Sequence, residues 1–284
     1  MPRNAKAFLF LNCFSGAPAP LSAMALSFLS KVFPPSWIPY IKFIRKPWNF
    51  YLLQKDKFNY ATDKLYTEVN TDFKKDPRFA SAYRWAEKLG GPLLPKTGME
   101  WRIYLLCWAA DQVRHLPGDF VACGVFSGFC DRAIMDYIDF GKTGKKYYLM
   151  DTFQGLDPRY SSDFEIKRNH TMGYAEAQNL YDQVKETFRD FNVRIVRGAI
   201  PDTLPEADTD QICFLSIDMN AVVPEVAAIE YFWPKLVPGG IIIFDDYGFP
   251  TCEAQKAGHD AFARSVGHTI FTSPTGQGIL IKQF

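Results

Sequence analysis

Three aspartates stand at the ends of two apolar runs in the second half of the chain. Asp218 closes the run ICFLSID, and Asp245 and Asp246 close the run GIIIFDD. If the two runs form neighbouring strands, about 4.8 Å apart, these carboxylates converge on one edge of a sheet. Like charges at such short range raise each other's pKa, and a hard divalent cation with oxygen ligands removes the conflict. We therefore expect a Mg²⁺ site, to which Asn220 can add a carbonyl oxygen. The alternative is that Asp245 or Asp246 only caps a turn.

A glycine pair follows an earlier apolar run, FVACGV. Gly124 and Gly128 enclose a short turn, which also contains Val125 and Ser127, and a predicted helix begins directly after it. Glycines at this place permit a tight turn and let a ligand approach the backbone and the helix N-terminus. Packing alone would explain them equally well. The spacing is not GxGxxG, which disfavours a dinucleotide site and a nicotinamide-dependent oxidoreductase.

An acidic residue ends the next run, KYYLMD. Asp151 lies 27 residues after Gly124. In nucleotide-binding α/β folds, an acid at this place accepts hydrogen bonds from ribose hydroxyls. The alternative is an aspartate that caps a helix or a turn.

These residues depend on a regular alternation of apolar runs and helical segments. The runs are 120–125, 146–151, 193–198, 212–218 and 240–246, and the helical segments are 127–138, 174–189, 224–235 and 252–265. Uninterrupted apolar strands that alternate with helices predict an α/β fold with a doubly wound, mostly parallel sheet. Two further strands, HTIFTS and GILIKQF, predict a C-terminal antiparallel hairpin.

Charge divides the chain unevenly. The 284 residues are 48% hydrophobic and carry a net charge of +1. Residues 1–55 hold seven basic groups and no acid, so the remaining residues carry a net charge of −6. An acidic body argues against a nucleic-acid binder. The six cysteines show no CxxC spacing, and we expect reduced thiols in a cytoplasmic protein.

The N-terminal part has its own composition. Residues 7–30 hold no charge, and basic and aromatic residues are interspersed in the segment after them. Residues 1–55 are therefore an arm that packs on the body or on a second subunit, touches a membrane surface, or serves as a targeting peptide. Residues 56–117 are expected to form a helical cap, in which Trp101 and Arg102 could cover a ligand, and residues 118–284 form the core.

Four segments together resemble the macrocin O-methyltransferase family, whose members are class I S-adenosylmethionine-dependent enzymes that methylate sugar hydroxyls. They are GDFVACGVFSGFCDRAI, YYLMDTFQGLD, RGAIPDTLP and FLSIDMNAVVPEVAAIEYFWPKLVPGGIIIFDDYG. The resemblance implies a Rossmann-like, seven-stranded sheet with a helical N-terminal extension. It also implies S-adenosylmethionine and Mg²⁺ as cofactors.

The resemblance assigns roles to residues that the strand ends already single out. The turn from Gly124 to Gly128 would line the methionine part of the cofactor, and Asp151 would hold its ribose, with Thr152 and Phe153 nearby. Asp218 would contact both cofactor and metal and would act as the general base. The metal set implied is Asp218, Asp245, Asp246 and Asn220.

The chain departs from the family pattern at three positions. Ala122 stands where an acid often holds the cofactor's amino end, which implies weaker or rearranged binding. Asn220 replaces the second acid of an Asp-x-Asp pair and reduces the negative charge of the site. Ala221 stands where related catechol methyltransferases have a lysine, so base catalysis by lysine is not expected.

The expected function is Mg²⁺-dependent methyl transfer to a hydroxyl of a sugar or glycosylated natural product. Alternatives are a phenolic or lipid-linked acceptor, and a non-catalytic binding protein on the same fold. His170, in the polar stretch KRNHTMGY, is an auxiliary base or a solvated loop histidine. Family members are commonly oligomeric, so a homo-oligomer is also expected.

Overall fold

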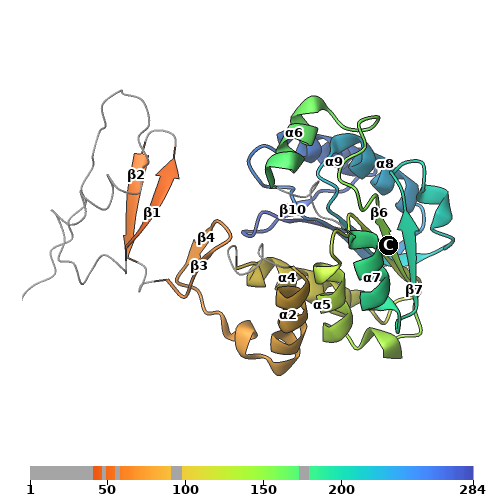
Figure 1. Ribbon diagram of the computed structural model, residues 1–284, viewed down its shortest axis with the longest axis horizontal. Helices are drawn as coiled ribbons and strands as arrows, with labels where there is room; N and C mark the ends of the chain where they lie inside the picture. The colour runs from red at the N-terminus through yellow and green to blue at the C-terminus, as the bar shows by residue number, and fades with distance from the viewer. Residues whose placement is uncertain (1–40, 47–48, 55–57, 91–97, 173–178, 284) are drawn as a thin grey trace, which may run out of the picture. The chain divides into compact units, whose positions relative to one another are not determined.

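The structure is a computed structural model that describes residues 41–46, 49–54, 58–90, 98–172 and 179–283 (Figure 1). The chain divides into two compact units, residues 1–61 with 66–70 and residues 62–65 with 71–284. The uncharged segment 7–30 lies outside the described residues, so membrane contact or targeting by the arm stays a prediction.

Two short hairpins precede the helices. Strands β1 (Ile41–Lys46) and β2 (Asn49–Gln54) pair antiparallel, and so do β3 (Tyr60–Thr62) and β4 (Leu65–Thr67). Asp63 and Lys64, which join β3 to β4, both have positive φ angles, 47° and 61°. This is the backbone of a two-residue type I′ turn. The expectation of helix from residue 56 onward is therefore wrong for residues 60–67.

Helices begin after these hairpins. The 3₁₀ helix η3 (Asp72–Lys75) leads into α2 (Pro77–Leu89), which Asp76 caps by accepting a hydrogen bond from the Arg78 amide. Helix α4 (Glu100–Val113) follows, and most of its faces are buried, as its apolar sequence predicts. These helices correspond to the predicted helical region before the core.

The larger unit contains the predicted sheet. Its seven strands are β5 (Asp119–Cys123), β6 (Tyr147–Asp151), β7 (Val193–Arg197), β8 (Ile212–Ile217), β9 (Leu236–Phe244), β10 (Phe271–Thr272) and β11 (Gly278–Ile281). Their order in the sheet is β10-β11-β9-β8-β5-β6-β7. Neighbours from β9 to β7 are parallel, whereas β11 runs antiparallel to β9 and β10. The doubly wound, mostly parallel seven-stranded sheet with a C-terminal hairpin is confirmed.

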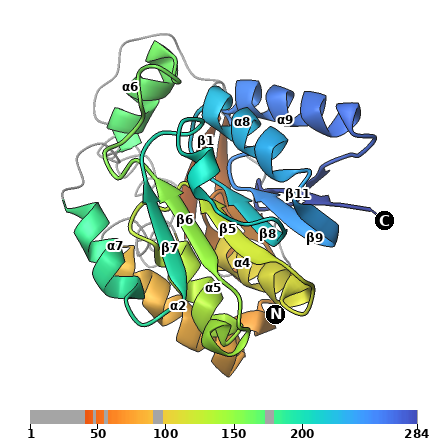
Figure 2. The same ribbon diagram turned by 90° about the vertical axis from the view of Figure 1, so that its right-hand side faces the viewer.

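Helices cover both faces of this sheet (Figure 2). Helices α2, α4, α5 (Phe129–Tyr137) and α7 (Leu180–Phe188) pack on one face, and α8 (Val222–Phe232) and α9 (Glu253–Ser265) pack on the other. Along β5, Phe120 and Ala122 join the first hydrophobic cluster, and Val121 and Cys123 join the second. Burial on both faces explains why the strands are apolar without alternation.

One helix was not anticipated. Helix α6 (Asp163–Met172) lies between β6 and β7, where the sequence suggested a polar loop. Only Glu165 and Asn169 are buried along it, so its sequence lacks the apolar stripe that identifies a helix. In place of apolar packing, the buried Glu165 side chain accepts a hydrogen bond from the Val222 amide at the start of α8, over 2.8 Å.

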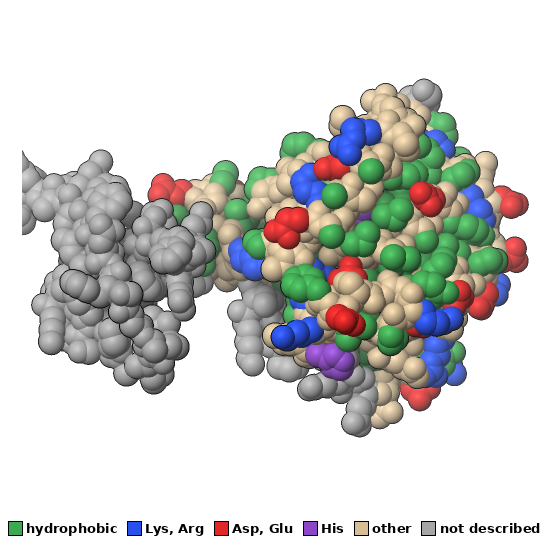
Figure 3. All heavy atoms as spheres, turned by 90° about the horizontal axis from the view of Figure 1, so that it is seen from above, with side chains coloured by type: hydrophobic (Ala, Val, Ile, Leu, Met, Phe, Trp, Pro, Cys, Tyr) green, Lys and Arg blue, Asp and Glu red, His purple; other side chains and the backbone are tan. Residues whose placement is uncertain are grey.

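The surface carries charges of both signs. On the face seen in Figure 3, acidic and basic side chains of the larger unit are interspersed, with hydrophobic side chains between them. The five cysteines in the described part of the chain, all except Cys13, are free thiols. Among the described residues, no helix combines the length and the apolar character needed to cross a membrane.

One buried carboxyl in the core is not part of the predicted site. Asp131 on α5 is 3% exposed, and it accepts a hydrogen bond of 2.9 Å from the Tyr147 hydroxyl on β6. Burial raises the pKa of Asp131 to about 7, because the charged form loses its solvation. The folded protein therefore holds a proton on Asp131 that the unfolded chain releases near pH 4.

The variant Asp131→Asn tests this buried carboxyl. Because the folded-state pKa is raised, the carboxyl lowers stability progressively as the pH rises from about 4 to about 7. Asparagine keeps an acceptor for Tyr147 and carries no charge. We measure the unfolding free energies of variant and native protein by urea titration. The difference between them should shift by about 3 kcal/mol in favour of the variant as the pH rises from about 4 to about 7. A difference that does not change with pH would contradict the assignment.

Candidate active site

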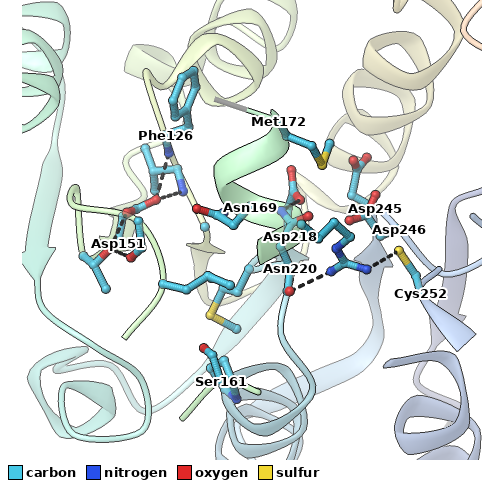
Figure 4. Close-up of a pocket in the computed structure, with 18 of the residues that line it drawn as sticks. Phe126, Asp151, Ser161, Asn169, Met172, Asp218, Asn220, Asp245, Asp246 and Cys252 are labelled. Atoms are coloured by element: carbon cyan, nitrogen blue, oxygen red, sulfur yellow. Dashed lines mark hydrogen bonds between the residues drawn. The ribbon is translucent and has the colours of Figure 1, made fainter. Parts of the chain in front are cut away.

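A cavity of about 620 Å³ opens at the carboxyl ends of the central strands (Figure 4). Strand order reverses at this place, since the chain runs from β5 outward to β7 and then returns to β8 on the other side of β5. Such a switch point is where open α/β sheets bind ligands. The predicted residues that line the cavity are Gly124, Val125, Asp151, Thr152, Phe153, Asp218, Asn220, Asp245 and Asp246.

The three aspartates meet as their strand positions predict. One carboxylate oxygen from each of Asp218, Asp245 and Asp246 lies within 4.8 Å of the others. Strands β8 and β9 are parallel neighbours, and the Asp245 amide continues their ladder by donating to the Ile217 carbonyl over 3.0 Å. Adjacent strands of matched register therefore bring the carboxylates together.

Burial and nearby charges raise the pKa values of two carboxyls in this cluster. Burial, followed by the nearby charge of Asp246, raises the pKa of Asp218 to about 8. Burial also raises the pKa of Asp246, although the Arg102 guanidinium opposes that effect. The structure thus contains the charge conflict that the sequence predicts at this edge of the sheet.

A cation of the protein itself enters the cluster. Arg102, on α4, forms an ion pair with Asp245, and its Nη1 also lies 3.7 Å from an oxygen of Asp63. The Asp245 carboxylate receives a second hydrogen bond of 2.9 Å from the buried Gln277 amide. From the sequence we expect Arg102 in a cover over the ligand, and neither contact is predicted there. No short motif marks them, because 143 residues separate Arg102 from Asp245.

A second arginine ties the two loops that carry the acids. Arg168 on α6 donates to the carbonyl of Asn220 and to the carbonyl of Thr251, both over 2.7 Å. Its guanidinium also lies 3.1 Å from the Cys252 sulfur. Figure 4 marks this contact with a dashed line at the labelled Cys252. The Asn220 side-chain amide donates to Asp218 over 3.3 Å. Arg168 therefore ties both loops to α6, and neither this residue nor its helix is predicted from the sequence.

Asp151 organises the turn after β5. One carboxylate oxygen accepts hydrogen bonds from the amides of Val125 and Phe126, over 2.7 and 2.8 Å. The other accepts the Phe153 amide over 2.6 Å. The turn-capping alternative is therefore present in the structure. The Thr152 hydroxyl lies 3.4 Å from the oxygen that accepts the Phe153 amide, so a ligand hydroxyl at Asp151 would take the place of this long contact.

The two glycines are explained by close packing. Gly124 has a φ of 93°, and a Cβ there would overlap the backbone carbonyl of Asp218. Gly128 has a φ of 75°, and a Cβ there would lie 2.5 Å from the Phe188 ring. Gly124 lines the cavity, whereas Gly128 and Ser127 do not. The Ser127 hydroxyl is buried beside the turn without a hydrogen-bond partner among the described residues.

Two further residues that the sequence singles out, His170 and Ala122, do not line the cavity. His170 lies on the exposed side of α6 and is not among the residues that line the cavity, so the structure does not bring it to the site. Ala122 is 1% exposed and packs in the first hydrophobic cluster. Its methyl group is part of the core between the sheet and the helices.

The variant Gly124→Ala tests the tight junction between β5 and β8. Because the added Cβ meets rigid backbone and the φ is left-handed, we expect a loss of roughly 3 kcal/mol or more of unfolding free energy. Gly144→Ala is the matched control, since Gly144 also has a positive φ, 71°, but no atom within 4 Å of its Cβ position. We expect it to cost about 1 kcal/mol by thermal or urea unfolding. Equal losses in both variants would contradict the close approach.

Solved structures with a similar fold are methyltransferases. The O-methyltransferase NovP superposes with a TM-score of 0.56 at 22% sequence identity, over 64% of this chain and 80% of that chain. CalS11, a calicheamicin methyltransferase, gives a TM-score of 0.54 at 17% identity, over 75% of this chain and 94% of that chain. At these identities the comparison shows the fold, which is that of class I methyltransferases.

Curated relatives have a higher sequence identity to this chain than these two solved structures have. The 8-demethyl-8-(2,3-dimethoxy-alpha-L-rhamnosyl)-tetracenomycin-C 4'-O-methyltransferase of Streptomyces olivaceus is 29% identical over 157 residues, 51% of this chain and 58% of that protein. The mycinamicin III 3''-O-methyltransferase of Micromonospora griseorubida is 28% identical over 160 residues, 51% of this chain and 60% of that protein. The chain thus spans less than two thirds of these relatives.

The family model covers more of the chain than these pairwise matches do. Residues 73–265 match the model of the macrocin-O-methyltransferase (TylF) family. This range includes α2, α4, strands β5 to β9 and every aspartate of the cluster. The chain therefore belongs to the macrocin-O-methyltransferase family.

Proposed function

We propose that this protein transfers a methyl group from S-adenosylmethionine to a hydroxyl group, with a sugar of a glycosylated natural product as the acceptor. The observation that carries the proposal is the convergence of Asp218, Asp245 and Asp246 in the same cavity as the turn after β5. Membership of the macrocin-O-methyltransferase family supports the reaction class. The names of the curated relatives support the acceptor class.

The cofactor fits between two walls of the cavity. In Figure 4, Asp151 lies on one side of the pocket and the three aspartates of the cluster lie on the other. We assign the ribose to Asp151, where its hydroxyl would replace the long contact from Thr152, with Phe153 beside it. We assign the methionine part to the turn that begins at Gly124. A cavity of about 620 Å³ is within the usual range for small-molecule sites.

The donor set also fits a hard divalent cation. Asp218, Asp245 and Asp246 offer carboxylate oxygens, and the side-chain oxygen of Asn220 is a further candidate. When bound, Mg²⁺ lowers the pKa of a hydroxyl that it contacts. Asp245 is engaged by Arg102 and Gln277, so a cation that binds its oxygens would lie directly beside the Arg102 guanidinium.

Asp218 is the residue that we assign as the general base. It lines the cavity, where its carboxylate can accept the proton of an acceptor hydroxyl held within hydrogen-bond distance. Asn220, the other polar residue of this loop, has no basic side chain and instead donates to Asp218. Holding the acceptor oxygen in line with the sulfonium supplies the rest of the rate enhancement.

Titration calorimetry with S-adenosylmethionine, with and without Mg²⁺, tests the proposal most simply. We expect cofactor binding with a Kd in the micromolar range. Absence of binding under both conditions would favour the alternative of a non-catalytic protein on this fold. Methyl transfer that does not depend on Mg²⁺ would remove the cation from the proposal.

The variant Asp218→Asn tests the base. With radiolabelled S-adenosylmethionine and a panel of macrocin, mycinamicin III and demethyldecarbamoylnovobiocin, we expect turnover to fall by about 100-fold or more on any acceptor that is used. Asp190→Asn, an exposed aspartate outside the cavity, is the matched control and should retain full turnover. Full activity of Asp218→Asn would exclude this residue as the base.

A further inference from the structure

The contact between Arg102 and Asp245 has the geometry of a specific pair. The guanidinium approaches Asp245 with two nitrogens, Nη2 on one oxygen and Nε at 3.3 Å from the other. The exposed fractions of the two side chains are only 13% and 6%. A two-point pair of this kind, shielded from solvent, is far stronger than a surface ion pair.

A buried glutamine completes the environment of Asp245. Gln277 is fully buried, and its Nε2 donates to Asp245 over 2.9 Å and lies 3.4 Å from the Arg102 carbonyl. Both oxygens of Asp245 are thereby used by the protein. This carboxylate is nevertheless one of the three whose oxygens lie within 4.8 Å of each other.

Arg102 also has a second acidic neighbour. Its Nη1 lies 3.7 Å from Asp63 on the turn between β3 and β4. The Phe249 ring, 4.9 Å from the guanidinium carbon, adds a favourable cation–π contact on another side. If the guanidinium leaves Asp245, it still has the Asp63 carboxylate and the Phe249 ring within reach. Its release therefore does not leave a buried positive charge without a partner.

We propose that Arg102 is a built-in competitor of the divalent cation, so that a cation that takes Asp245 as a ligand must displace the guanidinium toward Asp63. The inference rests on the proposed cation at the aspartate cluster and adds a residue that sets its affinity. Two positive charges cannot share Asp245 at short range, because their repulsion in a shielded site is large. Arg102 therefore weakens cation binding and keeps the cluster neutralised when no cation is bound.

Cation affinity of the variant Arg102→Gln is the direct test. Mn²⁺ is the probe, and the electron paramagnetic resonance signal of free Mn²⁺ reports how much is bound. Removing one positive charge a few ångströms from the cation should tighten binding about tenfold or more. Arg114→Gln is the matched control, because Arg114 follows α4 and pairs with Asp111 outside the cavity. We expect its affinity to equal that of the native protein.

A second variant covers the case in which Arg102→Gln does not fold. Arg102→Lys retains the charge, but an ammonium group cannot hold two carboxylate oxygens in a fork, so the pair with Asp245 weakens. We expect Mn²⁺ to bind about threefold tighter than to the native protein. Unchanged or weaker binding in whichever variant folds would overturn the inference.

The same samples separate this inference from the proposed function. S-adenosylmethionine titrations are run on the native protein in parallel. Cofactor binding without Mn²⁺ binding in any variant would overturn the role of Arg102 and leave the methyl-transfer proposal standing. Absence of cofactor binding, with Mn²⁺ affinity that rises when Arg102 is replaced, would support the role of Arg102 and contradict the methyl-transfer proposal.

Discussion

The site depends on one constraint, which is that two adjacent strands end in three carboxylates that solvent cannot fully screen. Strands β8 and β9 bring one carboxylate oxygen from each of Asp218, Asp245 and Asp246 within 4.8 Å of the others. Such a cluster must be neutralised by protons, by a cation of the protein or by a bound metal ion. The raised pKa values of Asp218 and Asp246 favour the first of these, and the pairing of Asp245 with Arg102 is an instance of the second.

The fold could be predicted from the sequence to a large extent. Strands that are apolar on both faces and alternate with helices specify a parallel sheet, and the structure has β5 to β9 in the predicted places. The position of an acid at a strand end also specifies the edge of the sheet at which it lies, because the carboxyl ends of parallel strands share one edge. This is why Asp151 and the three aspartates line the cavity as predicted.

Contacts made by long side chains over long sequence distances could not be predicted. Arg102 reaches Asp245 from a helix before the sheet, and Arg168 reaches Asn220 from a helix without an apolar stripe. Hydrophobic periodicity contains no signal for either contact. The same limit explains why His170 stayed open as an auxiliary base or a solvated histidine, since its exposed side of α6 depends on how that helix docks. The type I′ turn at Asp63 and Lys64 lacks the usual asparagine or glycine, so β3 and β4 were taken for helix.

A crystal structure of the protein grown with S-adenosylhomocysteine and Mn²⁺ would test the central claim most directly, since the anomalous signal of Mn²⁺ locates the cation. The account predicts the cofactor product between Asp151 and Asp218, a Mn²⁺ peak bonded to the aspartate cluster, and the Arg102 guanidinium moved from Asp245 to Asp63. A cofactor product in the cavity with Arg102 still on Asp245 and no Mn²⁺ peak would contradict it.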